Sequence, residues 1–173
     1  LDAYDRIREA GFENVNIDLM FALPNQTMDL WLRDLDKVRE LAPDHVSTYC
    51  LTFEEDTALY VKLAKGQIIQ DVEREADFYE RTWERLEAMG LQQYEVSNFA
   101  RPGKACQHNL NTWRMHEWIG FGPSASSQFG GRRFTNDANL ETWISGVESG
   151  NPARMDESEL TSGELALDSV IFG

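Results

Sequence analysis

Hydrophobic and polar residues alternate along this chain in a way that predicts three strands separated by helices. An apolar run over 15–23 stops at Pro24 and is typical of a buried strand. A second run over 45–52 is rich in β-branched and aromatic residues, and a third strand is predicted over 93–99. Because helices link these strands, the pattern predicts an α/β fold with a parallel sheet.

Two of the linking segments have apolar residues at helical spacing. Thr27 and Asp71 are predicted to cap these helices, which extend to about Pro43 and Gly90. In the first helix, Trp31, Leu35 and Val38 form the predicted buried stripe. The stripe predicted for the second helix is longer: Val72, Ala76, Tyr79, Trp83, Leu86 and Met89.

The rest of the pattern predicts shorter elements. A helix precedes the first strand and ends at Gly11, and a hairpin turns at Gly130-Gly131. Helices are predicted over 140–147 and 158–171, the second as the opening of another domain. The segment 107–125 is a poor strand and a poor helix, which favours a bare, mobile backbone near a flat aromatic or nucleoside ligand.

Composition narrows the class of protein. The net charge of −14 argues against a nucleic-acid or anionic-membrane surface, and no apolar run approaches the roughly 18 residues that span a bilayer. Cys50 and Cys106 have no metal-ligand spacing, and we expect them to be reduced thiols in a cytoplasmic protein.

Both ends of the sequence suggest a longer parent protein. The chain opens inside a predicted helix without Met and stops within an apolar run, so we expect it to be an internal piece.

Asp18 is the first candidate site residue. Strand alternation places it with Asn16 and Met20 on the side opposite the apolar residues, where it would face a barrel or crevice. We expect this carboxylate to be buried and therefore to need hydrogen-bond donors. Either a ligand hydroxyl or amine supplies them, or a neighbouring Arg or backbone amides do.

Thr52 and His108 are weaker candidates with ordinary alternatives. Thr52 is at the carboxyl end of the predicted strand, on the face opposite Tyr49. Ligands meet parallel sheets at such ends, although strand-end hydrogen bonding also explains the residue. His108 fits a metal ligand, an acid or base, a macrocycle ligand or a structural hydrogen bonder. His45 and His116 are weaker still, and Gly120-x-Gly122 lacks the context of a dinucleotide motif.

Five blocks in order resemble the radical S-adenosylmethionine proteins related to oxygen-independent coproporphyrinogen III oxidase. They are DLMFALPNQT (18–27), HVSTYCLT (45–52), YEVSNFA (94–100), HNLNTW (108–113) and GFGPSA (120–125). The fourth block is similar to the haem chaperone branch of that family. Thr112 stands where that branch usually has Tyr.

The resemblance implies a partial (β/α) radical S-adenosylmethionine barrel. Residues 1–136 would form its C-terminal part, and 137–173 a linker helix and the truncated start of a helical C-terminal domain. The full-length protein would hold a [4Fe–4S] cluster and S-adenosylmethionine, although the cluster motif of three cysteines is absent from this sequence. Asp18 and Thr52 match S-adenosylmethionine contacts, and His108, Asn109 and Trp113 are haem candidates.

Three functions are compatible with this resemblance. One is a chaperone that binds haem and delivers it to a respiratory protein. The alternative is the oxidase of porphyrin biosynthesis, which decarboxylates coproporphyrinogen III by radical chemistry. The third is an inert scaffold. In each case we expect the isolated chain to be inactive and to contain no catalytic or metal-binding residue of its own. The half-barrel implied by the resemblance would leave an open sheet edge, so we also expect the isolated chain to self-associate.

Overall fold

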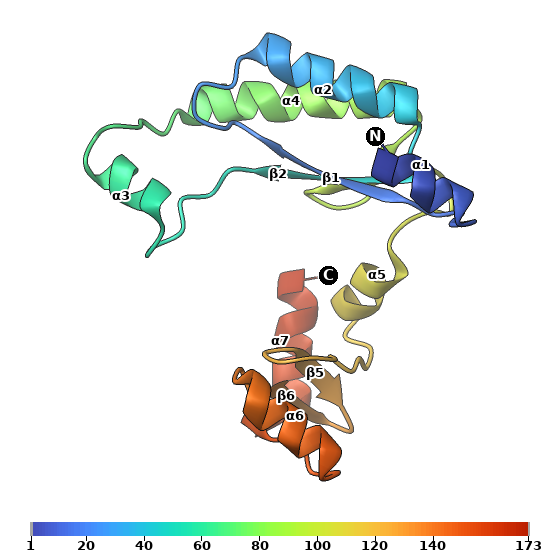
Figure 1. Cartoon of the computed structure of the whole chain (residues 1–173), viewed down its shortest axis with the longest axis vertical. Coiled ribbons are helices and arrows are strands. Elements are labelled where there is room, and N and C mark those ends of the chain that lie inside the picture. The colour runs from blue at the N-terminus through green and yellow to red at the C-terminus, as the bar shows by residue number, and fades with distance from the viewer. Residues whose placement is uncertain (1, 173) are drawn as a thin grey trace. The chain divides into compact units, whose positions relative to one another are not determined.

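A computed structural model of the chain describes residues 2–172 and divides it into two compact units (Figure 1). The first unit ends at Ala105 and the second begins at Cys106. The boundary predicted at 136/137 concerns the domains of the family and stays a prediction.

The first unit contains a four-stranded mixed sheet. Its strands are β1 (Asn16–Phe21), β2 (His45–Cys50), β3 (Gln92–Gln93) and β4 (Asn98–Ala100), in the order β1-β2-β4-β3. The predicted α/β class is confirmed, and β1 pairs with β2 in parallel. The described residues form no closed barrel.

The prediction of a parallel third strand over 93–99 is wrong. This segment folds into a short antiparallel hairpin, and β4 also runs antiparallel to β2. The Glu95 carboxylate accepts a hydrogen bond from the Ser97 N–H (2.8 Å), and the Tyr94 N–H donates to the Asn98 carbonyl (3.1 Å). These bonds close a turn where the sequence pattern predicted continuous strand.

Four helices belong to this unit: α1 (Asp2–Glu9), α2 (Met28–Leu41), α3 (Ala58–Ala64) and α4 (Val72–Ala88). The two predicted caps are confirmed. Thr27 Oγ1 accepts from the Leu30 N–H (3.3 Å), and Asp71 Oδ1 accepts from the Arg74 N–H (3.0 Å). Helices α2 and α4 lie together over one face of β1 and β2 (Figure 1).

The core lies between these helices and the sheet. Its fully buried members include Phe21 of β1, Trp31 and Leu35 of α2, and Phe78 of α4. The Phe21 ring lies 5.7 Å from the Trp31 ring and 6.5 Å from the Phe78 ring, measured between centroids. Aromatic packing therefore joins β1 to α2 and α4.

The buried stripe of α4 differs from the predicted one. Val72 and Trp83 are 69% and 47% exposed, and the buried residues are Phe78, Thr82 and Leu86. Thr82 faces inward because its hydroxyl accepts a hydrogen bond from the Trp31 indole (2.8 Å). Sequence patterning alone assigns Thr to the polar side and therefore rotates the helix incorrectly.

The second unit consists of a three-stranded antiparallel sheet and three helices. The elements are α5 (Gln107–Trp113), β5 (Ser126–Phe129), β6 (Arg132–Asn136), α6 (Leu140–Glu148), β7 (Arg154–Glu159) and α7 (Ser162–Phe172). The predicted hairpin is confirmed, with Gly130 and Gly131 at φ of +62° and +74°. The helix predicted over 140–147 is confirmed as α6.

The last helix is predicted to begin at residue 158, but α7 begins four residues later, at Ser162. Residues 154–159 form β7, which the sequence pattern missed because these residues are mostly polar and none of them is buried. The Arg132–Glu157 ion pair (3.1 Å) joins β7 to β6. Helix α7 then starts with a capping box, in which the Glu164 N–H donates to Thr161 Oγ1 and the Thr161 N–H donates to the Glu164 carboxylate.

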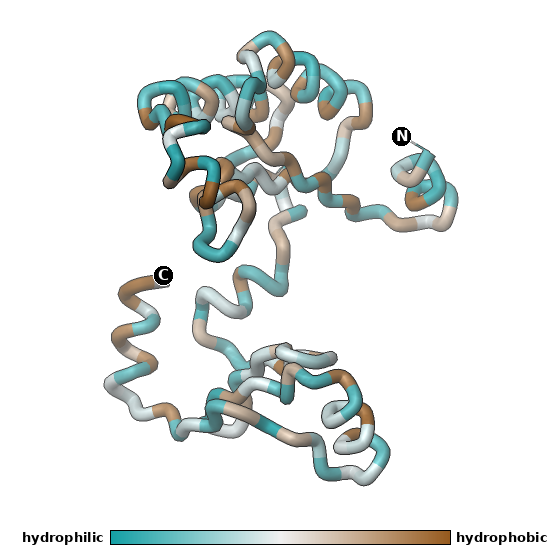
Figure 2. The backbone as a smooth tube through the Cα atoms, turned by 60° about the vertical axis from the view of Figure 1, so that its left-hand side comes forward, coloured by the Kyte–Doolittle hydropathy of each residue, from teal (hydrophilic) through white to brown (hydrophobic). Residues whose placement is uncertain are grey.

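Hydropathy along the backbone follows these elements (Figure 2). Helices α2 and α4 are mostly hydrophilic with apolar residues at intervals, whereas α7 is rich in apolar residues. Val170 of α7 is 82% exposed within the described structure. Among the described residues, no helix has both the length and the apolar character needed to cross a bilayer.

Thr82 provides a test of the core. Replacing Thr82 by Val removes the acceptor of the buried Trp31 indole N–H, and we expect a loss of about 1–3 kcal/mol in the free energy of unfolding. Thr82→Ser retains the hydroxyl and should lose clearly less. Urea unfolding followed by Trp fluorescence measures both. Equal stability of Thr82→Val and the unsubstituted chain would show that this hydrogen bond does not support the core.

Candidate functional site

The carboxyl ends of β1 and β2 lie at the same edge of the sheet because the two strands are parallel. An open pocket of about 590 Å³ lies there, and its lining includes Met20, Tyr49, Thr52 and Ser97. Such edges are the usual ligand sites of parallel sheets.

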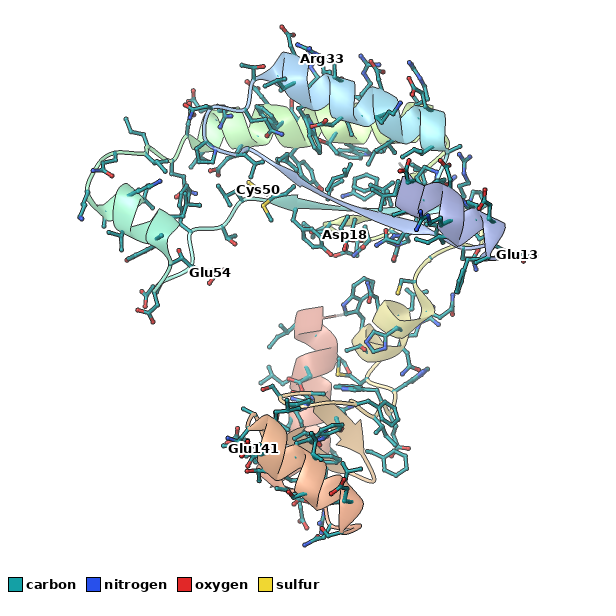
Figure 3. The ribbon with its side chains drawn as sticks, viewed as in Figure 1. Glu13, Asp18, Arg33, Cys50, Glu54 and Glu141 are labelled. Atoms are coloured by element: carbon teal, nitrogen blue, oxygen red, sulfur yellow. The ribbon has the colours of Figure 1, made fainter. Side chains whose placement is uncertain are left out.

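Asp18 lies on the sheet face that the helices leave uncovered. Leu19 and Phe21 pack into the core, and Asp18 and Met20 point to the other side and are exposed. Figure 3 shows Asp18 on the side of β1 away from α2 and α4. The predicted alternation is confirmed, but the expectation of a buried carboxylate is wrong for the described residues.

Asp18 belongs to a hydrogen-bond chain that crosses three segments of the unit. The Asn16 amide Nδ2 donates to Asp18 Oδ1 (2.7 Å), and Asn16 Oδ1 lies 2.7 Å from Nδ1 of His45. On the other side of the His45 ring, Nε2 lies 2.6 Å from the Tyr94 hydroxyl. Ser47 Oγ lies 3.1 Å from Asn16 Nδ2. The partner of Asp18 is therefore an amide rather than the arginine considered from sequence.

Burial determines the charge of His45. The residue is buried, which lowers the pKa of its imidazole below the ordinary value, although the carboxylates of Asp18 and Glu95 act in the opposite direction. The ring is accordingly neutral at pH 7. Sequence reasoning ranked His45 as a weak candidate because it begins a strand. Its partner Asn16 is identified only by the register of the two strands.

Thr52 lies two residues beyond the end of β2 and lines the pocket at the strand ends. Alternation predicted it on the face opposite Tyr49. Instead, both residues line the same pocket, because regular strand geometry ends at Cys50. The structure therefore brings Thr52 to the edge where Met20, two residues after Asp18, is also found.

The haem candidates lie on α5 in the second unit. The prediction of a poor helix over 107–125 is wrong for residues 107–113, which are helical. His108 is exposed, Asn109 and Trp113 are half-buried, and the Thr112 hydroxyl donates to the His108 carbonyl (3.0 Å). That bond gives Thr112 a structural role within the helix.

The second unit also has an apolar hollow of about 350 Å³. Its lining includes Phe121, Phe129 and Trp143 together with Arg132 and Arg154, and does not include the haem candidates of α5.

The glycine in the first position of this loop has a structural explanation. A Cβ on Gly120 would lie 2.3 Å from the Ser126 carbonyl oxygen, so packing within the unit requires glycine there. A ligand is not needed to explain this residue.

The described residues contain no group of three His, Cys, Asp or Glu side chains that could hold a metal ion. Cys50 belongs to the first unit and Cys106 to the second. Burial raises the pKa of the Cys50 thiol, with Glu75 acting in the same direction, which keeps it protonated.

Curated relatives match this chain over nearly its whole length. The haem chaperone HemW of Bacillus subtilis is 36% identical over 173 residues, covering 99% of this chain and 45% of the relative. HemW of Lactococcus lactis is 38% identical with the same coverage. The mitochondrial radical S-adenosyl methionine domain-containing protein 1 of Danio rerio is 38% identical over 78% of this chain and 32% of its own length. No protein-family model matches the chain.

The fold has a counterpart among solved structures. Coproporphyrinogen III oxidase (HemN) from Escherichia coli, described as a radical SAM enzyme, matches with a TM-score of 0.74 and 24% identity. The match covers 99% of this chain and 42% of HemN. At that identity it establishes the fold alone.

The chain is thus a relative of the radical S-adenosylmethionine proteins, with the α/β fold of part of HemN. Within that class it is a homologue of the HemW haem chaperones. It spans about 45% of the length of the curated HemW proteins that it matches over 173 residues.

The neutral state of His45 makes stability depend on pH. The unfolded chain takes up a proton on this imidazole near pH 6.5, whereas the folded chain does so only at lower pH. Acidification from pH 7.5 to 5.5 therefore favours the unfolded state. We expect the unfolding free energy to fall over that range, and to fall less in His45→Gln. His116→Gln is the control, because His116 is exposed. Urea titrations at the two pH values measure this. The same pH dependence with and without His45 would contradict it.

Proposed function

We propose that the protein carrying this chain is a haem chaperone of the HemW type, which binds haem and passes it to a respiratory protein. The observation that carries the proposal is the 36–38% identity to HemW proteins over 99% of the chain. The likeness to HemN concerns the fold and does not favour the decarboxylation of coproporphyrinogen III. The predicted cytoplasmic location is part of this proposal, although animal relatives are named mitochondrial.

We propose further that the polar face of the first unit binds the nucleoside of S-adenosylmethionine. The residues fit such a ligand. The Asp18 carboxylate is exposed on that face, Thr52 lines the adjoining pocket, and Asn98 Oδ1 is a buried acceptor without a hydrogen-bond partner in the described structure. Carboxylate and amide oxygens accept hydrogen bonds from ribose hydroxyls and from an amine.

The cluster is a different case. Its three thiolate ligands do not exist in this sequence, which has two cysteines. No step of a radical reaction is therefore assigned to the residues of this chain. When bound in the full-length protein, the cluster would supply the electron for such chemistry.

Haem would require an axial ligand and an apolar surface. His108 of α5 is an exposed imidazole, with Asn109 and Trp113 on the same helix. The apolar hollow of the same unit offers aromatic rings with two arginines, which suits a flat ring system that carries carboxylates. These features support haem binding by the second unit.

The role of His108 is testable by absorption spectroscopy. We expect full-length protein to shift the Soret band of added haem, and His108→Ala to weaken binding or change that spectrum because the axial nitrogen is lost. His116→Ala is the matched control, since His116 is also an exposed histidine of the second unit. Identical titrations of the unsubstituted protein and His108→Ala would rule out this ligand assignment.

Self-association of the isolated chain also remains a proposal. Within the described residues, β1 is an edge strand of six residues with pairing on one side only. We therefore expect the molar mass of the 173-residue chain to rise with concentration in light scattering. A monomer at every concentration would argue against pairing through that edge.

A further inference from the structure

The hydrogen-bond chain on the polar sheet face ends at the carboxylate proposed above to meet the ribose. We propose that Tyr94, His45 and Asn16 are positioning residues, which fix the Asp18 carboxylate in one orientation so that it recognises the ribose hydroxyls of an adenosyl ligand. This inference rests on the proposed nucleoside site and adds the residues that determine its selectivity.

The direction of every bond in the chain follows from its last member. An ionised carboxylate only accepts hydrogen bonds, so the Asn16 group facing Asp18 is the NH₂ group. Asn16 Oδ1 then faces His45 and must accept, so the proton of the neutral ring is on Nδ1. Nε2 is left as an acceptor, and the Tyr94 hydroxyl donates to it. Each member thus has one arrangement that satisfies both of its neighbours.

The hydrogen-bond chain is buried at His45 and exposed at Asp18. His45 and Ser47 are only 6% and 3% exposed, and Ser47 Oγ lies 3.1 Å from the Asn16 amide nitrogen. The Tyr94 ring meets the His45 ring edge-on, with 5.5 Å between centroids. Hydrogen bonds to these buried groups hold the Asn16 amide in place. Asn16 and Asp18 are themselves exposed.

The two oxygens of Asp18 are consequently unequal. Oδ1 accepts the hydrogen bond from Asn16, whereas Oδ2 has no hydrogen-bond donor among residues 2–172. A network that served only the stability of the sheet would end on buried groups. This one instead ends on an exposed carboxylate, on the same sheet face as Met20 of the pocket.

The hydrogen-bond chain orients the Asp18 carboxylate without neutralising its charge. All three positioning residues are uncharged, because burial lowers the pKa of His45. An arginine in the place of Asn16 would form an ion pair with Asp18 and compete with ligand hydroxyls for the same oxygens. An amide fixes one oxygen and leaves the negative charge available.

The experiment compares two probes on the full-length protein by calorimetry. The probes are S-adenosylhomocysteine and its 2′-deoxyadenosyl analogue, which lacks one ribose hydroxyl. The variants are Asp18→Asn, Asn16→Ala and Tyr94→Phe. Tyr60→Phe is the control, because Tyr60 lies on α3 and does not belong to the hydrogen-bond chain. Tyr94→Phe removes one oxygen atom and keeps the ring that packs on His45.

We expect Tyr94→Phe to weaken binding of the ribose probe roughly fivefold, the usual effect of one lost hydrogen bond. Binding of the deoxy probe should change less, so that discrimination between the two falls. Asn16→Ala should reduce discrimination further, and Tyr60→Phe should leave it unchanged. In unsubstituted protein, nitrogen NMR of labelled histidine should show the proton of one ring on Nδ1 at pH 7.5, a readout that needs no variant.

The outcomes separate this inference from the nucleoside site itself. If Asp18→Asn binds both probes as the unsubstituted protein does, the nucleoside site is refuted. If Asp18→Asn loses discrimination while Asn16→Ala and Tyr94→Phe keep it, the site stands and the positioning role is refuted. A His45 ring protonated on Nε2 alone would also refute it, because Asn16 would then be oriented with its NH₂ group toward His45.

Discussion

The two-sided character of β1 is the constraint on which the first unit depends. In a strand, neighbouring side chains point to opposite faces, so six residues provide both an apolar and a polar surface. Leu19 and Phe21 use one surface to hold α2 and α4, while Asn16 and Asp18 use the other for hydrogen bonding. A shift of pairing by one residue would bury Asp18 in the aromatic core and expose Phe21. Register therefore fixes the core and the site at once.

A buried polar contact between α2 and α4 adds to the apolar packing of the core. The Trp31 indole donates to Thr82, whose hydroxyl donates in turn to the Phe78 carbonyl (2.6 Å). Both groups are buried, so a rotation of either helix would leave an unpaired donor in the core. The helices are thereby held in one orientation over β1.

Sequence patterning was sufficient wherever one local signal determined the structure. The caps at Thr27 and Asp71, the Gly130-Gly131 turn and the parallel β1–β2 pair were all predicted. It failed where a tertiary partner decided, as with Thr82, whose inward orientation depends on an indole 51 residues away. The same holds for His45, which becomes part of the site only because pairing places it opposite Asn16 and the hairpin returns Tyr94 to its ring. Alternation identified Asp18, but not the residues that hold it.

The two units offer surfaces of different chemistry. The polar face of the first unit presents a fixed carboxylate and amides, which suit a ligand rich in hydroxyl groups. The second unit offers an aromatic hollow and an exposed histidine, which suit a flat apolar ring. Aromatic side chains offer no hydrogen-bonding groups for ribose hydroxyls. A polar, hydrated face in turn offers little apolar contact to a macrocycle. Two ligands of such different chemistry would require two surfaces, and these two surfaces belong to different compact units of the chain.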